Sequence, residues 1–85
     1  MNEVEVWAVT FVTNLDSSFD SLTDDEKLRE NLFTSGRLDS MALMDLLLDL
    51  ETNFGFTFTA EAFQDRRIHT ITGLSEVVAE FLVKV

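Results

Sequence analysis

The chain has no cysteine, no proline, three glycines and a single histidine among its 85 residues. The lack of cysteine excludes disulfide bonds, thiolate zinc sites and cysteine nucleophiles. The lack of proline and the scarcity of glycine argue against a β fold with many turns, because such turns depend on these two residues. One histidine, His69, offers too few groups for an independent small enzyme or a metal site. We therefore expect no catalytic residues and no metal ion.

Positive charge is also scarce, since six Lys and Arg stand against 16 Asp and Glu, giving a net charge of −10. Binding to nucleic acid needs Lys and Arg to neutralise phosphates, so we expect no nucleic-acid partner. An excess of carboxylates instead keeps a protein soluble and monomeric and draws it toward basic protein surfaces, more strongly at low salt.

Long hydrophobic runs are missing as well. No stretch reaches the roughly 18 apolar residues that a membrane-spanning helix needs. The first residues include Glu3 and Glu5 and lack the basic start and apolar stretch of a signal peptide. We therefore expect no membrane span and a cytoplasmic location.

Hydrophobic residues make up 46% of the chain, with eight Phe and one Trp, which is enough for the core of a single domain over residues 1–85. Apolar residues recur at helical spacing. The predicted elements are a helix over about 2–15, a long loop with one or two helical turns over 16–39, a helix over 40–54, a short helix over 60–65 and a last helix that opens at Thr70 or Thr72. The predicted fold is all-α, a four-helix bundle with three main helices, a short third helix and a long first loop.

Local signals set the ends of these elements and their buried faces. Thr23 and Glu26 fit a capping box inside the long loop, Gly55 is placed to stop the helix over 40–54, and Thr59 can cap the short helix with Phe63 as its anchor. The residues predicted to face the core from the first and last helices are Val4, Ala8, Phe11, Val12, Leu15, Leu74, Val77, Val78, Phe81 and Val85.

The helix over 40–54 carries more apolar residues than one buried face needs. Positions at about 100° per residue divide them into three groups. The core group is Leu43, Leu46, Leu47, Leu50 and Phe54, the acidic group contains Asp45 and Asp49, and the third group is Met41, Met44 and Leu48. The third group widens the core face, is covered by the long loop, or forms a partner groove, since Met-rich surfaces adapt to several shapes. Neighbouring carboxylates would then steer a basic partner to it.

An Asp-Ser pair, Asp39 and Ser40, opens this helix after a polar loop. Asp and Ser are preferred helix N-cap residues, and capping alone explains most such serines. A serine in the first helical turn also lies where backbone N–H groups and the helix dipole favour a phosphate. From the pair alone, both interpretations stay open.

Together with its surroundings, the pair resembles the signature of the acyl carrier protein family, in particular its discrete, stand-alone bacterial members. Leu38-Asp39-Ser40-Met41 is similar to the family's Asp-Ser-Leu motif, with Met in place of Leu. The helix ends in Leu50-Glu51-Thr52-Asn53-Phe54-Gly55, like the family's acidic helix that ends in Phe. The segment over 30–38 is similar to the family's entry loop, and the match keeps one register from about Glu30 to Leu82.

The resemblance implies that Ser40 carries 4′-phosphopantetheine, installed from coenzyme A by a separate phosphopantetheinyl transferase. The terminal thiol of the arm would hold an acyl or aminoacyl group as a thioester, so the protein would be a carrier and not an enzyme. The expected partners are this transferase, an acyl- or aminoacyl-loading enzyme, and an acyltransferase or synthase with a basic docking surface. The positions expected to contact partners are Met41, Met44, Asp45, Leu48, Asp49 and Glu51, with Asp39 as part of the attachment motif.

Two departures from the fatty-acid carriers bear on the pathway. Ala42 stands where many of them have an acidic residue, and Leu43 replaces a smaller polar one. The segment over 58–71 is longer and contains Phe63, Arg66 and Arg67. These features favour a polyketide or other secondary-metabolite pathway. The alternatives are an aminoacyl carrier of a non-ribosomal or D-alanylation type and an unmodified acidic helical interaction module.

Overall fold

The structure, a computed structural model, describes residues 1–82. All the regular elements of the described part are helices, and it contains no strand. The elements are α1 (Glu3–Leu15), the 3-10 helix η1 (Ser17–Ser21), α2 (Asp24–Arg29), α3 (Ser40–Phe54), the 3-10 helices η2 (Ala60–Gln64) and η3 (Arg66–His69), and α4 (Ile71–Leu82). The predicted all-α fold with three main helices is confirmed by α1, α3 and α4. No helix among these residues is long and apolar enough to cross a membrane.

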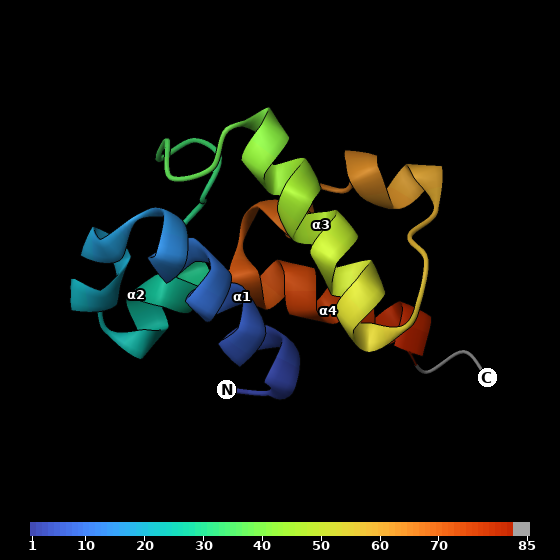
Figure 1. Cartoon of the computed structure of the whole chain (residues 1–85), viewed down its shortest axis with the longest axis horizontal. Coiled ribbons are helices and arrows are strands. Elements are labelled where there is room, and N and C mark those ends of the chain that lie inside the picture. The colour runs from blue at the N-terminus through green and yellow to red at the C-terminus, as the bar shows by residue number, and fades with distance from the viewer. Residues whose placement is uncertain (83–85) are drawn as a thin grey trace.

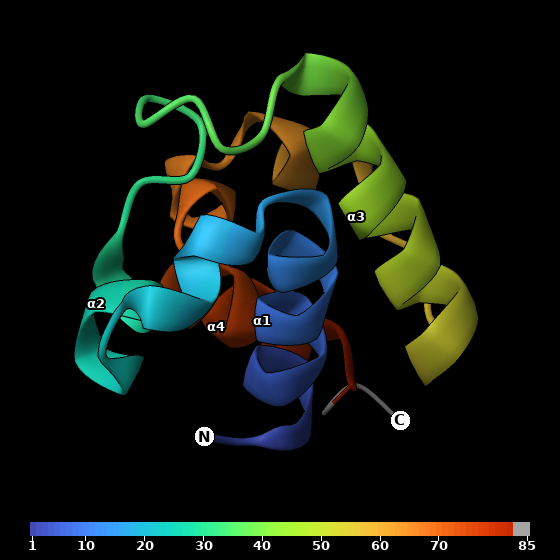
Figure 2. The same ribbon diagram turned by 60° about the vertical axis from the view of Figure 1, so that its left-hand side comes forward.

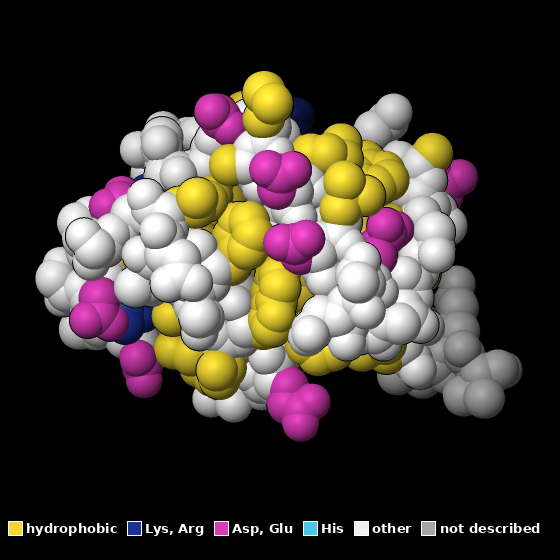
Figure 3. Space-filling model, viewed as in Figure 1, with side chains coloured by type: hydrophobic (Ala, Val, Ile, Leu, Met, Phe, Trp, Pro, Cys, Tyr) yellow, Lys and Arg dark blue, Asp and Glu magenta, His cyan; other side chains and the backbone are white. Residues whose placement is uncertain are grey.

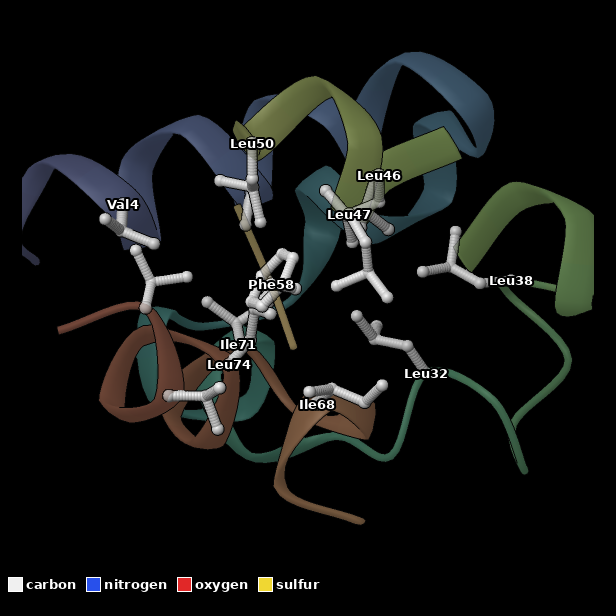
Figure 4. Close-up of a cluster of buried hydrophobic side chains, with 14 of the residues drawn as sticks. Val4, Leu32, Leu38, Leu46, Leu47, Leu50, Phe58, Ile68, Ile71 and Leu74 are labelled. Carbon is white, nitrogen blue, oxygen red and sulfur yellow. The ribbon is translucent and has the colours of Figure 1, made fainter. Parts of the chain in front are cut away.

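Helix α1 lies between α2 and α3, with α4 behind it (Figures 1 and 2). The buried apolar side chains of α1, α3 and α4 meet in one core, part of which Figure 4 shows, and Leu28 of α2 packs against it. The core includes Leu46, Leu47 and Leu50 of α3 as well as Ile71 and Leu74 of α4. Each helix has one apolar and one polar face. Burial of the apolar faces against each other stabilises the bundle.

Capping side chains begin α1, α2 and α4 close to the predicted starts of these helices. Asn2 and Glu5 form a capping box at α1, and the Asn2 side chain also donates to Ser75 Oγ of α4 over 2.7 Å. The predicted capping box of Thr23 and Glu26 is present at α2. The hydroxyl of Thr70, one of the two predicted starts of the last helix, accepts a hydrogen bond from the Gly73 N–H over 3.0 Å.

Gly55 ends α3 as predicted. Its φ of 74° lies in the left-handed region that favours glycine, and its N–H donates to the Glu51 carbonyl over 2.9 Å. The Glu51 side chain then accepts a hydrogen bond from the Phe58 N–H over 2.6 Å. This second bond ties the extended link that follows Gly55 back to the end of α3.

One prediction about burial is wrong. Leu15 is 56% exposed, because α1 ends there and the chain turns away into η1. Leu43 and Phe54, in contrast, pack against the core as predicted, although both are half-buried. Val85 lies outside the described residues.

The predicted short third helix is also different from expectation. It is a 3-10 helix, Thr59 makes no side-chain cap, and Phe63 is half-buried while Ala62 beside it is buried. A second 3-10 helix, η3, follows at once and was not predicted. Runs of only four or five residues are too short to show a helical period, so the sequence gives little signal for them.

Candidate functional site

The Asp-Ser pair lies at the exposed N-terminus of α3. Asp39 is the N-cap, with extended backbone, and its carboxylate accepts a hydrogen bond from the Ala42 N–H over 2.8 Å. Ser40 is the first residue of the helix and is exposed. Its hydroxyl has no hydrogen-bond partner among residues 1–82. The interpretation of Ser40 as a capping residue is therefore wrong, because Asp39 does the capping and leaves the serine hydroxyl available.

Backbone donors also remain available at this end of the helix. The N–H groups of Ser40 and Met41 have no acceptor within the described chain, whereas Asp39 satisfies the next two through its side chain and its carbonyl. These free donors and the dipole of a 15-residue helix favour an anion. A phosphodiester on the Ser40 oxygen would lie next to them, so the residues present fit a covalently attached phosphopantetheine.

The loop that leads to Ser40 is tied firmly to the body of the protein. Leu38 is buried and points toward Leu32 and Leu47 at one end of the core (Figure 4). The Leu38 N–H donates to the Leu32 carbonyl over 3.0 Å, and the Leu32 N–H donates to the His69 carbonyl of η3 over 2.8 Å. The neighbouring Phe33, although it is largely exposed, stacks on the His69 ring at 5.3 Å. The loop before Ser40 is therefore held against the core, while the Ser40 side chain is exposed to solvent.

Arg37 holds the same loop against α1 and η1. Its guanidinium bonds Asp16 Oδ2 and Ser18 Oγ, each over 3.0 Å, and its Nε bonds the Glu30 carboxylate. The guanidinium also lies 5.0 Å from the centre of the buried Phe19 ring, a cation–π contact. Although Arg37 lies three residues before Ser40, its charge is already paired with two carboxylates, so it stabilises the loop and is not free to bind a phosphate.

The charge of Asp16 contributes to this network. The hydrogen bond from the Ser18 hydroxyl lowers the pKa of Asp16 below its ordinary value of 3.8, and the Arg37 charge lowers it further. A carboxyl group whose pKa is lower in the folded than in the unfolded protein stabilises the fold. This contribution is complete above the unfolded pKa and is lost as the pH falls through the folded pKa.

We expect Asp16→Asn, which keeps a good cap for η1, to destabilise the protein near pH 6 and to approach the wild type near pH 2. Denaturant unfolding of both proteins at several pH values measures this. A difference in the free energy of unfolding that stays constant over this range would show that the charge of Asp16 is not what stabilises the loop.

The predicted contact positions on α3 differ in their surroundings. Met41, Met44 and Leu48 are exposed by 77%, 44% and 47%, so they do not widen the core face. Asp45 and Asp49 are exposed beside them. Figure 3 shows acidic and hydrophobic side chains next to each other along α3. Glu51 is half-buried, and its carboxylate bonds the Phe58 N–H, so it has a structural role that its position in the sequence did not indicate.

Comparison with protein families bears on the chemistry of this site. The model of the phosphopantetheine attachment site family matches residues 12–78, most of the chain. The chain belongs to this family. It is a carrier protein of the acyl-carrier type with a covalently attached 4′-phosphopantetheine, and it is not an enzyme. A search of curated proteins and a search of solved structures each gave no match.

Carriers of this family work with transferases and synthases, so these enzymes are partners of the chain. No cluster of His, Asp and Glu within residues 1–82 could hold a metal ion. Arg67 of η3 pairs with Asp65 over 2.8 Å and with Glu80 over 2.9 Å.

Proposed function

We propose that Ser40 is the residue to which 4′-phosphopantetheine is attached. The observation that carries this proposal is the unpaired, exposed Ser40 hydroxyl beside two free backbone N–H groups at the start of α3. The hydroxyl would form the ester to the phosphate, and the two N–H groups with the helix dipole would stabilise the phosphate charge. A transferase would supply the base for this step, because no histidine or carboxylate within residues 1–82 bonds the hydroxyl.

The arm supplies a thiol that holds an acyl or aminoacyl group as a thioester. The chain has no cysteine, so the arm would carry its only thiol, and cargo loaded on it would have no competing thiol within the protein. The structural role of the protein is then to hold the attachment point of the arm in one position. The hydrogen bonds from Leu38 and Leu32 and the pairing of Arg37 support this role, since they hold the loop on which Ser40 lies.

The test is the intact mass of the purified protein after incubation with coenzyme A, magnesium and a phosphopantetheinyl transferase of broad specificity. We expect a gain of one phosphopantetheinyl group per chain. Folded protein, shown by its helical circular dichroism, that gains no mass would contradict the proposal and favour an unmodified interaction module.

We further propose that the exposed part of α3 next to Ser40 is where partner enzymes dock. Met41, Met44 and Leu48 would give the apolar contact, and Asp45 and Asp49 would pair with Lys and Arg around the partner's active site. Glu51 is left out of this surface because its carboxylate is committed to the Phe58 N–H. This arrangement brings a basic partner to the same end of the molecule as the arm.

We expect the double variant Asp45→Lys with Asp49→Lys to slow modification by the transferase by about tenfold at low salt, because steering charges act mainly on the association rate. The effect should shrink as salt rises and the Debye length falls from about 30 Å at 0.01 M to about 3 Å at 1 M. Initial rates of mass gain over a salt series measure this.

The matched control reverses two exposed acidic residues elsewhere, Glu61→Lys with Glu76→Lys, which changes the net charge by the same amount. An equal loss of rate in the control would show that net charge alone matters. An unchanged rate in the α3 variant would move the docking surface away from α3.

We propose that the cargo belongs to a polyketide or related secondary-metabolite pathway, and that the carrier works as a monomer. Ala42 and Leu43, next to the attachment residue, support the pathway, because they replace polar positions of the fatty-acid carriers. The net charge of −10 supports the monomer, since two copies would repel each other. Loading of the chain by an aminoacyl-activating enzyme would instead assign it to a non-ribosomal or D-alanylation type of pathway.

A further inference from the structure

A second apolar surface lies away from Ser40, between α1, from Glu3 to Asn14, and the end of α3. It is an open groove of about 580 Å³. The residues that form it include Glu3, Val6, Trp7 and Phe11 of α1 and Asn53 and Phe54 of α3. Trp7 stacks on Phe11 at 5.6 Å and meets the edge of Phe54 at 6.5 Å, so three aromatic rings form its floor. Val6 on its wall is 51% exposed.

The side-chain charges of the two helices that form this groove are all negative, and Glu3 is the carboxylate that lines it. Helices α1 and α3 contain no Lys, Arg or His, and they carry Glu3, Glu5, Asp45, Asp49 and Glu51. Asp45, Asp49 and Asn53 follow one another at four-residue spacing, so the carboxylates of α3 lie on the same stripe as the groove residue Asn53. Figure 3 shows hydrophobic side chains gathered in a band on this face with acidic side chains beside them, and Lys and Arg only toward its margins.

We propose that this groove binds a cationic amphipathic helix of a partner protein. The apolar face of that helix would cover Trp7, Phe11 and Phe54, and its Lys and Arg side chains would pair with Glu3 at one end and with Asp49 along α3. Packing of an amphipathic helix into an apolar groove is a common recognition mode, and Trp is enriched among the residues that dominate such interfaces. Charge complementarity selects a basic occupant.

Other occupants fit less well. A second copy of the chain would bring another net charge of −10 against the same carboxylates. A fatty acid would find apolar walls, but its carboxylate would meet the carboxylate of Glu3, and the one cationic group on the lining is the amino group of Met1. Among these occupants, a basic partner is the one that complements the carboxylates of α1 and α3.

The groove lies at the opposite end of α3 from Ser40, and its proposed partner helix shares Asp49 with the proposed enzyme-docking surface. Asn53 lies 13 residues after Ser40 on the same helix, which is about 20 Å at 1.5 Å per residue. A partner helix bound here leaves Ser40, Met41 and Met44 open to the enzyme that acts on the arm. The groove therefore acts as a tethering site, and it does not depend on which residue carries the arm.

The test uses the full chain with Ser40→Ala, so that the result is independent of modification. The probe is a synthetic amphipathic helix of about 14 residues, matching the roughly 20 Å length of α1, with Leu on one face, Lys on the other and no Trp. One control peptide has Glu in place of Lys, and another has Gln in place of Leu. Fluorescence of Trp7, the single tryptophan of the chain, follows binding, and backbone amide shifts in nuclear magnetic resonance spectra locate it.

We expect saturable binding of the Leu/Lys peptide alone, with the largest amide shifts around Val6, Trp7 and Phe54. Val6→Asp should weaken binding by about tenfold or more, as expected for a residue inside an apolar contact. Leu15→Asp is the matched control, because it places the same charge at an equally exposed position of α1 outside the groove. It should change the dissociation constant by less than about twofold.

Three results would overturn the proposal. Equal binding of the peptide with Gln in place of Leu would show that attraction between charges, and not an apolar contact, causes the binding. Amide shifts centred on Met41 and Met44 would move the peptide to the enzyme-docking end of α3. Saturable binding of decanoate with none of the Leu/Lys peptide would make the groove a lipid site. The amide shifts need no variant, so the test stands even if Val6→Asp does not fold.

Discussion

Replacement of Ser40 by alanine should abolish attachment of phosphopantetheine while leaving the fold intact. The hydroxyl is the only atom of the side chain that can form the ester, and it makes no hydrogen bond within the described chain. Helix capping is done by Asp39, and alanine is the best helix former, so the free energy of unfolding should change by no more than about 0.5 kcal/mol. Intact mass after treatment with the transferase and denaturant unfolding measure the two quantities.

Two variants serve as controls for this result. Ser35→Ala alters an exposed serine in the same loop and should leave modification complete. Asp39→Ala removes the true cap and should cost about 0.5–2 kcal/mol of stability. Modification that persists in Ser40→Ala would move the attachment to another serine. A loss of stability in Ser40→Ala equal to that in Asp39→Ala would show that Ser40 also caps the helix.

Replacement of Gly73 by alanine should have the largest effect on stability. A Cβ atom at this position would lie 2.2 Å from the Arg67 carbonyl oxygen and 2.9 Å from the Arg67 carbonyl carbon. These are backbone atoms of η3, so no side-chain movement relieves the overlap. We expect a loss of at least about 3 kcal/mol, near the top of the usual range for overpacking. For a domain of this size that lowers Tm by about 12–24 °C.

Gly73→Ala should also destabilise the loop that leads to Ser40, because η3 holds this loop in place. The His69 carbonyl accepts the Leu32 N–H, and the Leu32 carbonyl accepts the Leu38 N–H. Displacement of η3 should therefore speed hydrogen exchange at the amides of Leu32 and Leu38. Glu76→Ala, at an exposed position of the same helix, is the control and should leave Tm and exchange close to those of the wild type.

A rise in the Tm of Gly73→Ala would contradict this prediction. Alanine in an open helical position is more favourable than glycine by about 1 kcal/mol, so a rise in Tm would show that α4 and η3 do not approach closely. Unchanged exchange at Leu32 and Leu38 in a destabilised variant would show that the loop is held independently of η3.

The parts of the fold that the sequence predicts are those with local causes. The capping box of Thr23 and Glu26 and the stop at Gly55 depend on residues within four positions of each other, and both are present. The apolar period of α3 separates Leu46 and Leu47 from the exposed Met41 and Met44. These features follow from helix geometry alone and need no knowledge of the tertiary structure.

The features that were missed depend on contacts between distant segments. The pairing of Arg37 with Asp16 spans 21 residues, and the support of Leu32 by His69 spans 37, so no local pattern indicates either. The exposure of Leu15 depends on where the chain turns after α1. The bond from the Phe58 N–H to Glu51 likewise needs the link after Gly55 to fold back, which the period of α3 does not encode.

The central claim is that the arm is attached to Ser40. Fragmentation of the modified protein in a mass spectrometer tests it most directly, because fragments that contain Ser40 can be separated from those with the serines over 17–35 or Ser75. We predict that the added mass, and the loss of pantetheine on activation, occur only on fragments that include Ser40. Added mass on a fragment that ends before Asp39, or on one that begins after Met41, would contradict the claim.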